Sequence, residues 1–357
     1  MTKDVFITII ISVVLCLVLA ATADAKVFRF EDSFEYSVEA GFKLTINNSA
    51  GAIIVSRVEG DKVIVKVTKE IDASSREDAE EMEDRIEVAI DARADRIEID
   101  TRQPDGKRMN GFLGDLFGLK SGFNGSVNYQ IEIPTSVDIA IASTSGEVEL
   151  NGLEGKIHIA ATSSDITVRT AKANCDIENT SGDIRMKDVT GDIDVMSTSS
   201  DALFDNVQGN INLQATSGDT EAHWVTGAIR ITKTSGNCLI GKLTGEVDVK
   251  TISGDIEIDQ REGGFSLTTS SGDIQVDSEF NNGTRFEAET ISGNIVVRLP
   301  AESKGDVRLE TISGNIDTNL ALEVRSFNRN RLEGRLRGGG TGIFLTSTSG
   351  DISLEEY

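Results

Sequence analysis

The 357-residue sequence is poor in the side chains that most enzymes and metal sites use. It contains 2 histidines, 3 cysteines, 1 tryptophan and 3 tyrosines. A catalytic nucleophile normally needs an adjacent base, and zinc sites need several His or Cys ligands at short spacing. His158 and His223 are 65 residues apart and have no such neighbours. The sequence therefore predicts no catalytic residue, no resident metal and no cofactor.

Basic residues are also scarce relative to acidic ones. Lysine and arginine together number 35, whereas aspartate and glutamate number 59, giving a formal net charge of -24. Binding to nucleic acid relies on Lys and Arg contacts with phosphates. The charge therefore argues against a nucleic-acid partner and favours a soluble acidic protein.

The only long apolar run lies at the N-terminus. Residues 5–20 are mostly apolar, Lys3 precedes them, and Ala23-Asp24-Ala25 follows as a small-residue cleavage site. The run has 16 residues, fewer than the roughly 20 of a spanning helix. We expect residues 1–25 to be a signal peptide, so that the mature chain begins at Lys26 and is periplasmic, surface-attached or secreted.

The two cysteines of the mature chain, Cys175 and Cys238, take places that hold Ile or Val elsewhere in the repeat described next. Free cysteine is among the most buried residue types. We expect both to be buried and unbridged.

A Ser-Gly-Asp-Ile type motif recurs from residue 145 to the end of the chain. Its first serine returns seven times at intervals of 18 residues and then after 21, 21 and 36 residues, at positions Ser145, Ser163, Ser181, Ser199, Ser217, Ser235, Ser253, Ser271, Ser292, Ser313 and Ser349. So short a period is typical of a solenoid, in which each copy is one rung. The last interval suggests a hidden degenerate rung starting at Arg331, with Ile343 and Leu345 as its later inward residues.

Apolar residues alternate within each copy, at positions 3 and 5 and again at positions 12 and 14 after the serine, as in Ile184, Met186, Ile193 and Val195. Alternation of this length indicates strands, and stacked identical rungs align them in parallel. The nine-residue spacing predicts two half-turns of one nonapeptide. We therefore predict an all-β fold: a right-handed, two-walled parallel β-solenoid with 18-residue rungs over residues 145–357.

Residues 26–144 are predicted to form an irregular β cap. Alternating apolar residues indicate strands, and Ser75 with Asp78 resembles a capping box that starts one helix over residues 75–85. Residues 105–125 form a Gly/Phe-rich loop. Its apolar side chains, including Phe112, Leu116 and Phe117, fold back over an open end or are presented to a partner or to a membrane surface as a peripheral contact.

Two further groups are candidate binding residues. Arginines cluster in a basic loop near residues 325–342, at Arg329, Arg331, Arg335 and Arg337; the loop is simply solvated or docks an anionic envelope component. Aspartates recur two residues after the serine, at Asp165, Asp183, Asp201, Asp219, Asp255 and Asp273. They are weak calcium candidates, because stacked oxygens suit calcium; the structural alternative is that each is a turn former that accepts local backbone N–H bonds.

The T-S-G-D-I turns, as at residues 180–184, together with the signal peptide and the irregular β lead-in, resemble the bacterial β-strand-repeat family called "putative adhesin", a family of unknown function. The resemblance covers residues 26–357. It implies an exported β-solenoid of the cell envelope or surface, and it transfers no catalytic residues.

The leading hypothesis is a non-enzymatic, adhesin-like binding or scaffold module whose partner is an envelope or surface protein or glycan. Two alternatives remain open. One is a polysaccharide-acting lyase or hydrolase on a parallel β-helix, with outward acids such as Asp176 and Asp194 as its carboxylate pair. The other is a structural stalk stiffened by calcium.

Overall fold

The computed structural model describes residues 26–60, 62–102, 125–134, 136–279 and 285–356. Within these residues the chain has 28 strands and one helix, which confirms the all-β prediction. The chain divides into two compact units, residues 1–167 and 168–357, and each is considered by itself. The predicted signal peptide, residues 1–25, lies outside the described residues. The predicted Gly/Phe-rich loop, residues 105–125, also lies outside them except for its last residue.

Among its described residues, unit 1 contains nine strands around two short parallel ladders. They are β1 (Lys26–Tyr36), β2 (Phe42–Ala50), β3 (Ile53–Arg57), β4 (Val63–Ala73), β5 (Glu87–Ala92), β6 (Arg96–Arg102), β7 (Gly125–Ile133), β8 (Val137–Asn151) and the start of β9 (Glu154–Ser181). Strand β2 pairs in parallel with β6 and β8, and β3 pairs in parallel with β7 and β8. Beyond them, β5 is antiparallel to β6, β4 to β7, and β1 to β4.

The single helix, α1 (Arg76–Glu83), lies where the sequence predicts it. The Ser75 side chain accepts a hydrogen bond from the Asp78 N–H at 3.1 Å, which caps the first turn. Ala79 is buried on the apolar side of the helix. No helix in the described part of the chain is long and apolar enough to span a membrane.

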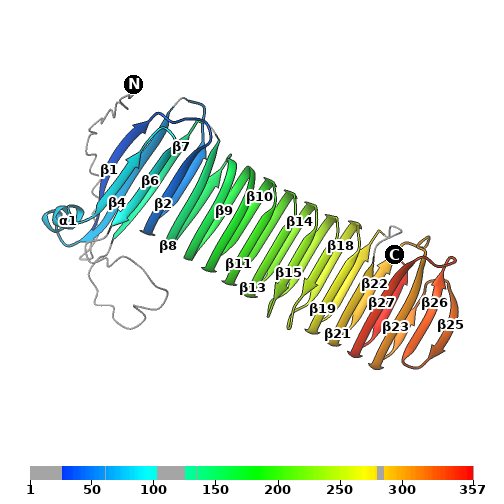
Figure 1. The fold of residues 1–357 in the computed structure, drawn as a ribbon. Coiled ribbons are helices and arrows are strands. Elements are labelled where there is room, and N and C mark those ends of the chain that lie inside the picture. Colours follow the sequence, from blue (N-terminus) through cyan, green and yellow to red (C-terminus); the bar gives the residue numbers. More distant parts are fainter. Residues whose placement is uncertain (1–25, 61, 103–124, 135, 280–284, 357) are drawn as a thin grey trace. The chain divides into compact units, whose positions relative to one another are not determined.

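Unit 2 is a stack of two ladders of parallel strands (Figure 1). The first ladder begins with β10 (Ile184–Thr190), β12 (Ala202–Gln208), β14 (Thr220–Thr226), β16 (Cys238–Thr244), β18 (Ile256–Glu262), β20 (Ile274–Ser278) and β22 (Ile295–Leu299). The second begins with the end of β9, then β11 (Ile193–Ser199), β13 (Ile211–Ser217), β15 (Ile229–Lys233), β17 (Val247–Lys250), β19 (Phe265–Ser271) and β21 (Phe286–Ser292).

The core of unit 2 is made by the residues that the repeat predicts. Ile184 pairs with Ala202, and Ile193 pairs with Ile211, so equivalent residues stack directly. The side chains of Ile184 and Ile193 are 0% and 1% exposed. Stacking of these aliphatic side chains removes a continuous apolar surface from water, which is the main stabilising contribution to such a stack.

The two half-turns of a rung are not equivalent, contrary to the nonapeptide prediction. The first half-turn carries one residue with positive φ before its last inward residue, as at Asp188, Asn206 and Trp224, whose φ values are 55°, 57° and 58°. This extra residue turns the chain, and the next residue, such as Val189 or Val207, points inward. The second half-turn keeps simple alternation.

The C-terminal strands are not stacked in the order of the sequence. They are β23 (Gly305–Ser313), β24 (Ile316–Thr318), β25 (Leu322–Asn328), β26 (Arg331–Leu336), β27 (Thr341–Ser349) and β28 (Ile352–Glu356). Strand β27 lies between β21 and β23, and β28 lies between β22 and β24, all in parallel. The last rung of the chain is therefore inserted between the two rungs that precede it.

The predicted degenerate rung starting at Arg331 is thus wrong. Strand β26 is antiparallel to both β23 and β25. Figure 1 shows the hairpin of β25 and β26 beside β23 in unit 2. An open parallel stack would leave a row of unpaired backbone groups at its edge. The antiparallel hairpin covers β23, while Ile343 and Leu345 fill the inward places of the inserted rung.

Candidate functional site

The aspartates two residues after each serine form a hydrogen-bonded column, here called the turn column, together with the asparagines at the same place. Its members, in spatial order, are Asp201, Asp219, Asn237, Asp255, Asp273, Asn294, Asp351 and Asn315. Each side-chain Oδ1 accepts the backbone N–H of the next member, at 2.7–3.0 Å. The side chains therefore satisfy backbone donors, as the turn-former interpretation expects, but the donor lies on the neighbouring rung.

Four of the six calcium candidates belong to the turn column, where one carboxylate oxygen of each already accepts a hydrogen bond. Asp201, Asp219, Asp255 and Asp273 each use one oxygen in the column, and Asp183 pairs with Arg185 at 2.5 Å. Nowhere in the described ranges do three or more His, Cys, Asp or Glu side chains form a group that could hold a metal ion. A calcium role for Asp165 and the other candidates stays a prediction.

A second column, here called the groove column, follows the turn before the second ladder. Its members are Asn174, Asp192, Asn210, Ala228, Glu246, Gly264 and Arg285. Asn174 Oδ1 accepts the Asp192 N–H at 3.0 Å, Asp192 accepts the Asn210 N–H at 2.9 Å, and Asn210 accepts the Ala228 N–H at 3.0 Å. Alanine has no acceptor, so the column of side-chain hydrogen bonds stops there.

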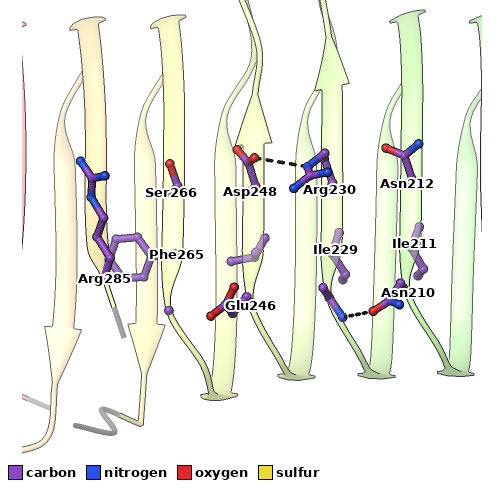
Figure 2. Close-up of a pocket in the computed structure, with 13 residues that line it drawn as sticks. Asn210, Ile211, Asn212, Ile229, Arg230, Glu246, Asp248, Phe265, Ser266 and Arg285 are labelled. Carbon is purple, nitrogen blue, oxygen red and sulfur yellow. Dashed lines mark hydrogen bonds and ion pairs between the residues drawn. The ribbon is translucent and has the colours of Figure 1, made fainter. Parts of the chain in front are cut away.

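A groove of about 520 Å³ opens where the groove column stops. One side is formed by the groove column from Asn210 to Arg285, and the other by the outward residues of β13, β15, β17 and β19, which are Asn212, Arg230, Asp248 and Ser266. Figure 2 shows the latter four in one row, with Asn210 and Glu246 in the other. The buried residues Ile211, Ile229, Val247 and Phe265 supply its floor.

The groove offers both hydrogen-bond donors and acceptors. Arg230 pairs with Asp248 at 3.4 Å, as the dashed line in Figure 2 marks, and this contact uses Asp248 Oδ2. The other oxygen, Oδ1, is buried and accepts no hydrogen bond. Among the described residues, the backbone N–H groups of Glu246 and Gly264 also meet no acceptor.

The arginines singled out in the sequence lie in the C-terminal hairpin of unit 2 and not in an open loop. Arg331 pairs with Glu310 at 3.1 Å and also with Glu333, and Arg335 pairs with Asp306 at 3.0 Å. Arg337 donates to the Ala301 carbonyl at 2.9 Å, and Arg329 is exposed at the hairpin turn. Phe112, Leu116 and Phe117 lie outside the described residues. Both groups stay predicted partner-binding residues.

The remaining candidate chemistry is dispersed. Cys175 and Cys238 are buried and free, as predicted, and burial raises the pKa of the Cys175 thiol to about 12. Asp176 and Asp194 are neighbours on β9 and β11, but Asp194 already accepts a hydrogen bond from the Asn212 amide at 2.9 Å. The His223 ring lies 3.8 Å from Glu221.

A family model matches most of the chain and shows the family to which it belongs. The model of the family described as Toastrack DUF4097 matches residues 42–241 and 240–355. The chain belongs to the Toastrack DUF4097 family. This agrees with the resemblance found in the sequence. Among curated proteins, none matches this Toastrack chain.

Several solved structures are similar to this Toastrack chain at low identity. A "putative adhesin" from Parabacteroides distasonis is 14% identical, with 92% of this chain and 97% of that chain covered and a TM-score of 0.31. A "putative adhesin" from Bacteroides fragilis is 12% identical, with 91% and 97% covered and a TM-score of 0.27. A "putative lipid binding protein" from P. distasonis is 13% identical, with 92% and 96% covered and a TM-score of 0.35.

The groove residues were not predicted from the sequence, although a signal for them exists. The groove column has Asn or Asp in Asn174, Asp192 and Asn210, and then changes to Ala, Glu and Gly. Such a break in an otherwise regular Asx position marks the place where backbone donors lose their acceptors.

Proposed function

We propose that this Toastrack chain is a non-enzymatic, adhesin-like binding module of the cell envelope or surface, exported by a signal peptide at residues 1–25. The observation that carries the proposal is the groove on unit 2, an outward-facing hollow built from five successive rungs. Rungs fix its side chains in place before any partner binds, and preorganisation reduces the entropy lost on binding.

Binding is favoured over catalysis by the state of the carboxylates near the groove. Asp248 is paired with Arg230, and Asp194 accepts a hydrogen bond from Asn212. A glycosidase requires one carboxyl group held as an acid beside a free carboxylate. The partner is an envelope or surface component, protein or glycan, and the module needs no cofactor.

The finer architecture belongs to the same proposal. We propose that residues 145–357 form a right-handed, two-walled solenoid that has 18-residue rungs in its regular part and carries the antiparallel β25–β26 hairpin near its C-terminal end, preceded by a cap over residues 26–144. The pairing of Ile184 with Ala202 and of Ala202 with Thr220 supports the rung length. An experimental density map of the mature chain would give the hand of the coil directly.

Photocrosslinking in cells tests the functional proposal. The full chain is expressed with its leader, with a photoreactive residue placed at Asn212 in the groove or, as a control, at Glu257 on the first ladder. We expect an exported chain beginning at Lys26 and an envelope adduct formed mainly from position 212. A chain that stays in the cytoplasm, or that forms no adduct from either position, would contradict the proposal.

A further inference from the structure

The groove column shows which kind of ligand atom could bond to its unpaired backbone N–H groups, namely a hydrogen-bond acceptor. In three successive rungs an Asn or Asp oxygen receives the next backbone N–H at 2.9–3.0 Å. The backbone N–H groups of Glu246 and Gly264 make no such bond in the described part of the chain: Ala228 has no side-chain oxygen, and the longer Glu246 side chain does not accept the Gly264 N–H. The two donors are one rung apart, about 4.8 Å. A ligand oxygen can accept each of these two N–H groups.

Acceptor side chains line the same space. The Glu246 and Asp248 carboxylates both belong to the groove lining, although Asp248 Oδ1 itself is buried and has no hydrogen-bond partner. Carboxylate oxygens accept hydrogen bonds and do not donate them. The ligand therefore has to donate as well as accept, and hydroxyl groups do both.

The charges of the groove favour an uncharged ligand. Its lining has two arginines, Arg230 and Arg285, and two acids, Glu246 and Asp248, so the formal charges sum to zero. The whole chain carries -24 and repels polyanions as they approach. A polycation would meet the two arginines within the groove.

The floor of the groove disfavours a peptide. Ile211, Ile229, Val247 and Phe265 are 1–2% exposed, so they leave no apolar pockets for side chains. The strands beneath are paired in the ladder on both sides, and no strand edge is open for an added β-strand. A chain of hydroxyl-bearing rings needs neither feature.

Resting on the proposed binding function, we propose that the groove between Asn210 and Arg285 binds a neutral linear oligosaccharide that lies along the stack, across the rungs. Five groove-column residues span four rung spacings, about 19 Å, which accommodates three to four sugar rings. Sugar oxygens accept from the Glu246 and Gly264 N–H groups, and sugar hydroxyls donate to the Glu246 and Asp248 carboxylates. Because Phe265 is buried, no ring stacking contributes, and the affinity is of millimolar order.

The variant Ala228→Asn tests the site because it completes the column. Its amide oxygen is placed to accept the Glu246 N–H, as Asn210 accepts the Ala228 N–H. The added bond keeps or raises the thermal midpoint while occupying the ligand's place. Glu257→Gln on the first ladder is the matched control, because it alters one exposed polar side chain away from the groove.

The experiment follows backbone amide resonances of the mature chain during titration with cellotetraose, chitotetraose, tetragalacturonate and a capped Gly-Ser tetrapeptide. We expect saturable shifts of the Glu246 and Gly264 amides with a neutral tetrasaccharide, unchanged in Glu257→Gln and weakened about tenfold in Ala228→Asn. Intact spectra elsewhere show that each variant is folded.

Three results of the titration, and one result in cells, would overturn the proposal. Shifts of these amides with tetragalacturonate alone would assign an acidic ligand, shifts with the peptide alone would assign a protein partner, and no shift with any probe would remove the site. If Ala228→Asn still crosslinks to the envelope in cells, the groove proposal fails while the proposed binding function stands.

Discussion

The turn column predicts that oxygen atoms, and not negative charges, are what stabilise the stack at its Asp positions. Asp255 tests this, because its Oδ1 accepts the Asp273 N–H at 2.9 Å and its own N–H donates to Asn237 at 3.0 Å. The substitution Asp255→Asn keeps an oxygen acceptor, whereas Asp255→Ala removes it. Both substitutions remove the charge.

The magnitudes follow from this geometry. Two carboxylates one rung apart, about 4.8 Å, repel by roughly 1 kcal/mol in water, and both variants are relieved of this repulsion equally. Only Asp255→Ala loses the hydrogen bond, with a net contribution of about 0.5–1.5 kcal/mol. We therefore expect Asp255→Asn to be at least as stable as the wild type and more stable than Asp255→Ala by about 1 kcal/mol.

Hydrogen exchange of the Asp273 amide is the site-specific assay, because a long repeat array need not unfold in one step. Exchange should be faster in Asp255→Ala than in Asp255→Asn, and urea midpoints should follow the same order. Equal exchange in the two variants would refute the role of the acceptor. If Asp255→Asn were as unstable as Asp255→Ala, and calcium stabilised only the wild type, the column would be a cation site.

Three further predictions test the packing of unit 2. Gly254→Ala should destabilise the protein by at least about 2 kcal/mol, measured by urea unfolding, because its φ is +143° and a Cβ there would lie 2.1 Å from a carbonyl oxygen of the preceding rung. Cysteines introduced in pairs test the inserted position of β28. The pairs at Val296 and Ser353, and at Ser353 and Asp317, should form disulfides on mild oxidation, because these residues are paired across adjacent strands. The pair at Val296 and Asp317 should not, because β28 lies between them and separates them by about 9.6 Å. The Cys175 thiol should resist labelling in the native protein at pH 9, because its folded pKa of about 12 lies above the ordinary value of 9.0. Since folding favours the neutral thiol, the contribution of Cys175 to stability is complete below pH 9 and is lost as the pH rises toward 12. Unfolding midpoints measured at pH 7 and pH 10.5 would show this loss.

The two ladders of unit 2 could be predicted because one physical requirement repeats in every copy. Ile184, Met186 and Ile193 must be inward for the rung to bury any apolar surface, and the same requirement holds 18 residues later. The hydrophobic pattern alone therefore fixes which side chains form the core.

The order of the last rungs could not be predicted, because identical copies fit one another equally well. Thr311 and Ser347 occupy equivalent places, and each donates a hydrogen bond to the turn glycine carbonyl of the preceding rung, Gly350 and Gly293 respectively. Either order satisfies such bonds locally. The antiparallel hairpin of β25 and β26, which pairs with β23 beside the inserted rung, has no counterpart in the repeat.

The candidate site could not be predicted from the sequence either, because its residues resemble those at other outward positions. Arg230, Glu246 and Asp248 are ordinary outward residues of a polar wall, and only the interrupted hydrogen bonds beside them distinguish their place. Lys233 shows the same limit in the core: it is 4% exposed, and its ammonium group donates to the Gly218 and Asn237 carbonyls at 3.2 and 2.5 Å. Those carbonyls are created by the turn, and no propensity of lysine reveals them.

A binding isotherm of the purified mature chain on washed envelopes of its own organism tests the proposed binding function most directly. We expect saturable binding that survives chelation of divalent cations, equals that of Glu257→Gln, and is reduced about tenfold in the folded Ala228→Asn variant. Binding that never saturates, or no binding at all, would contradict the claim that this protein acts through a preformed surface of its stacked rungs.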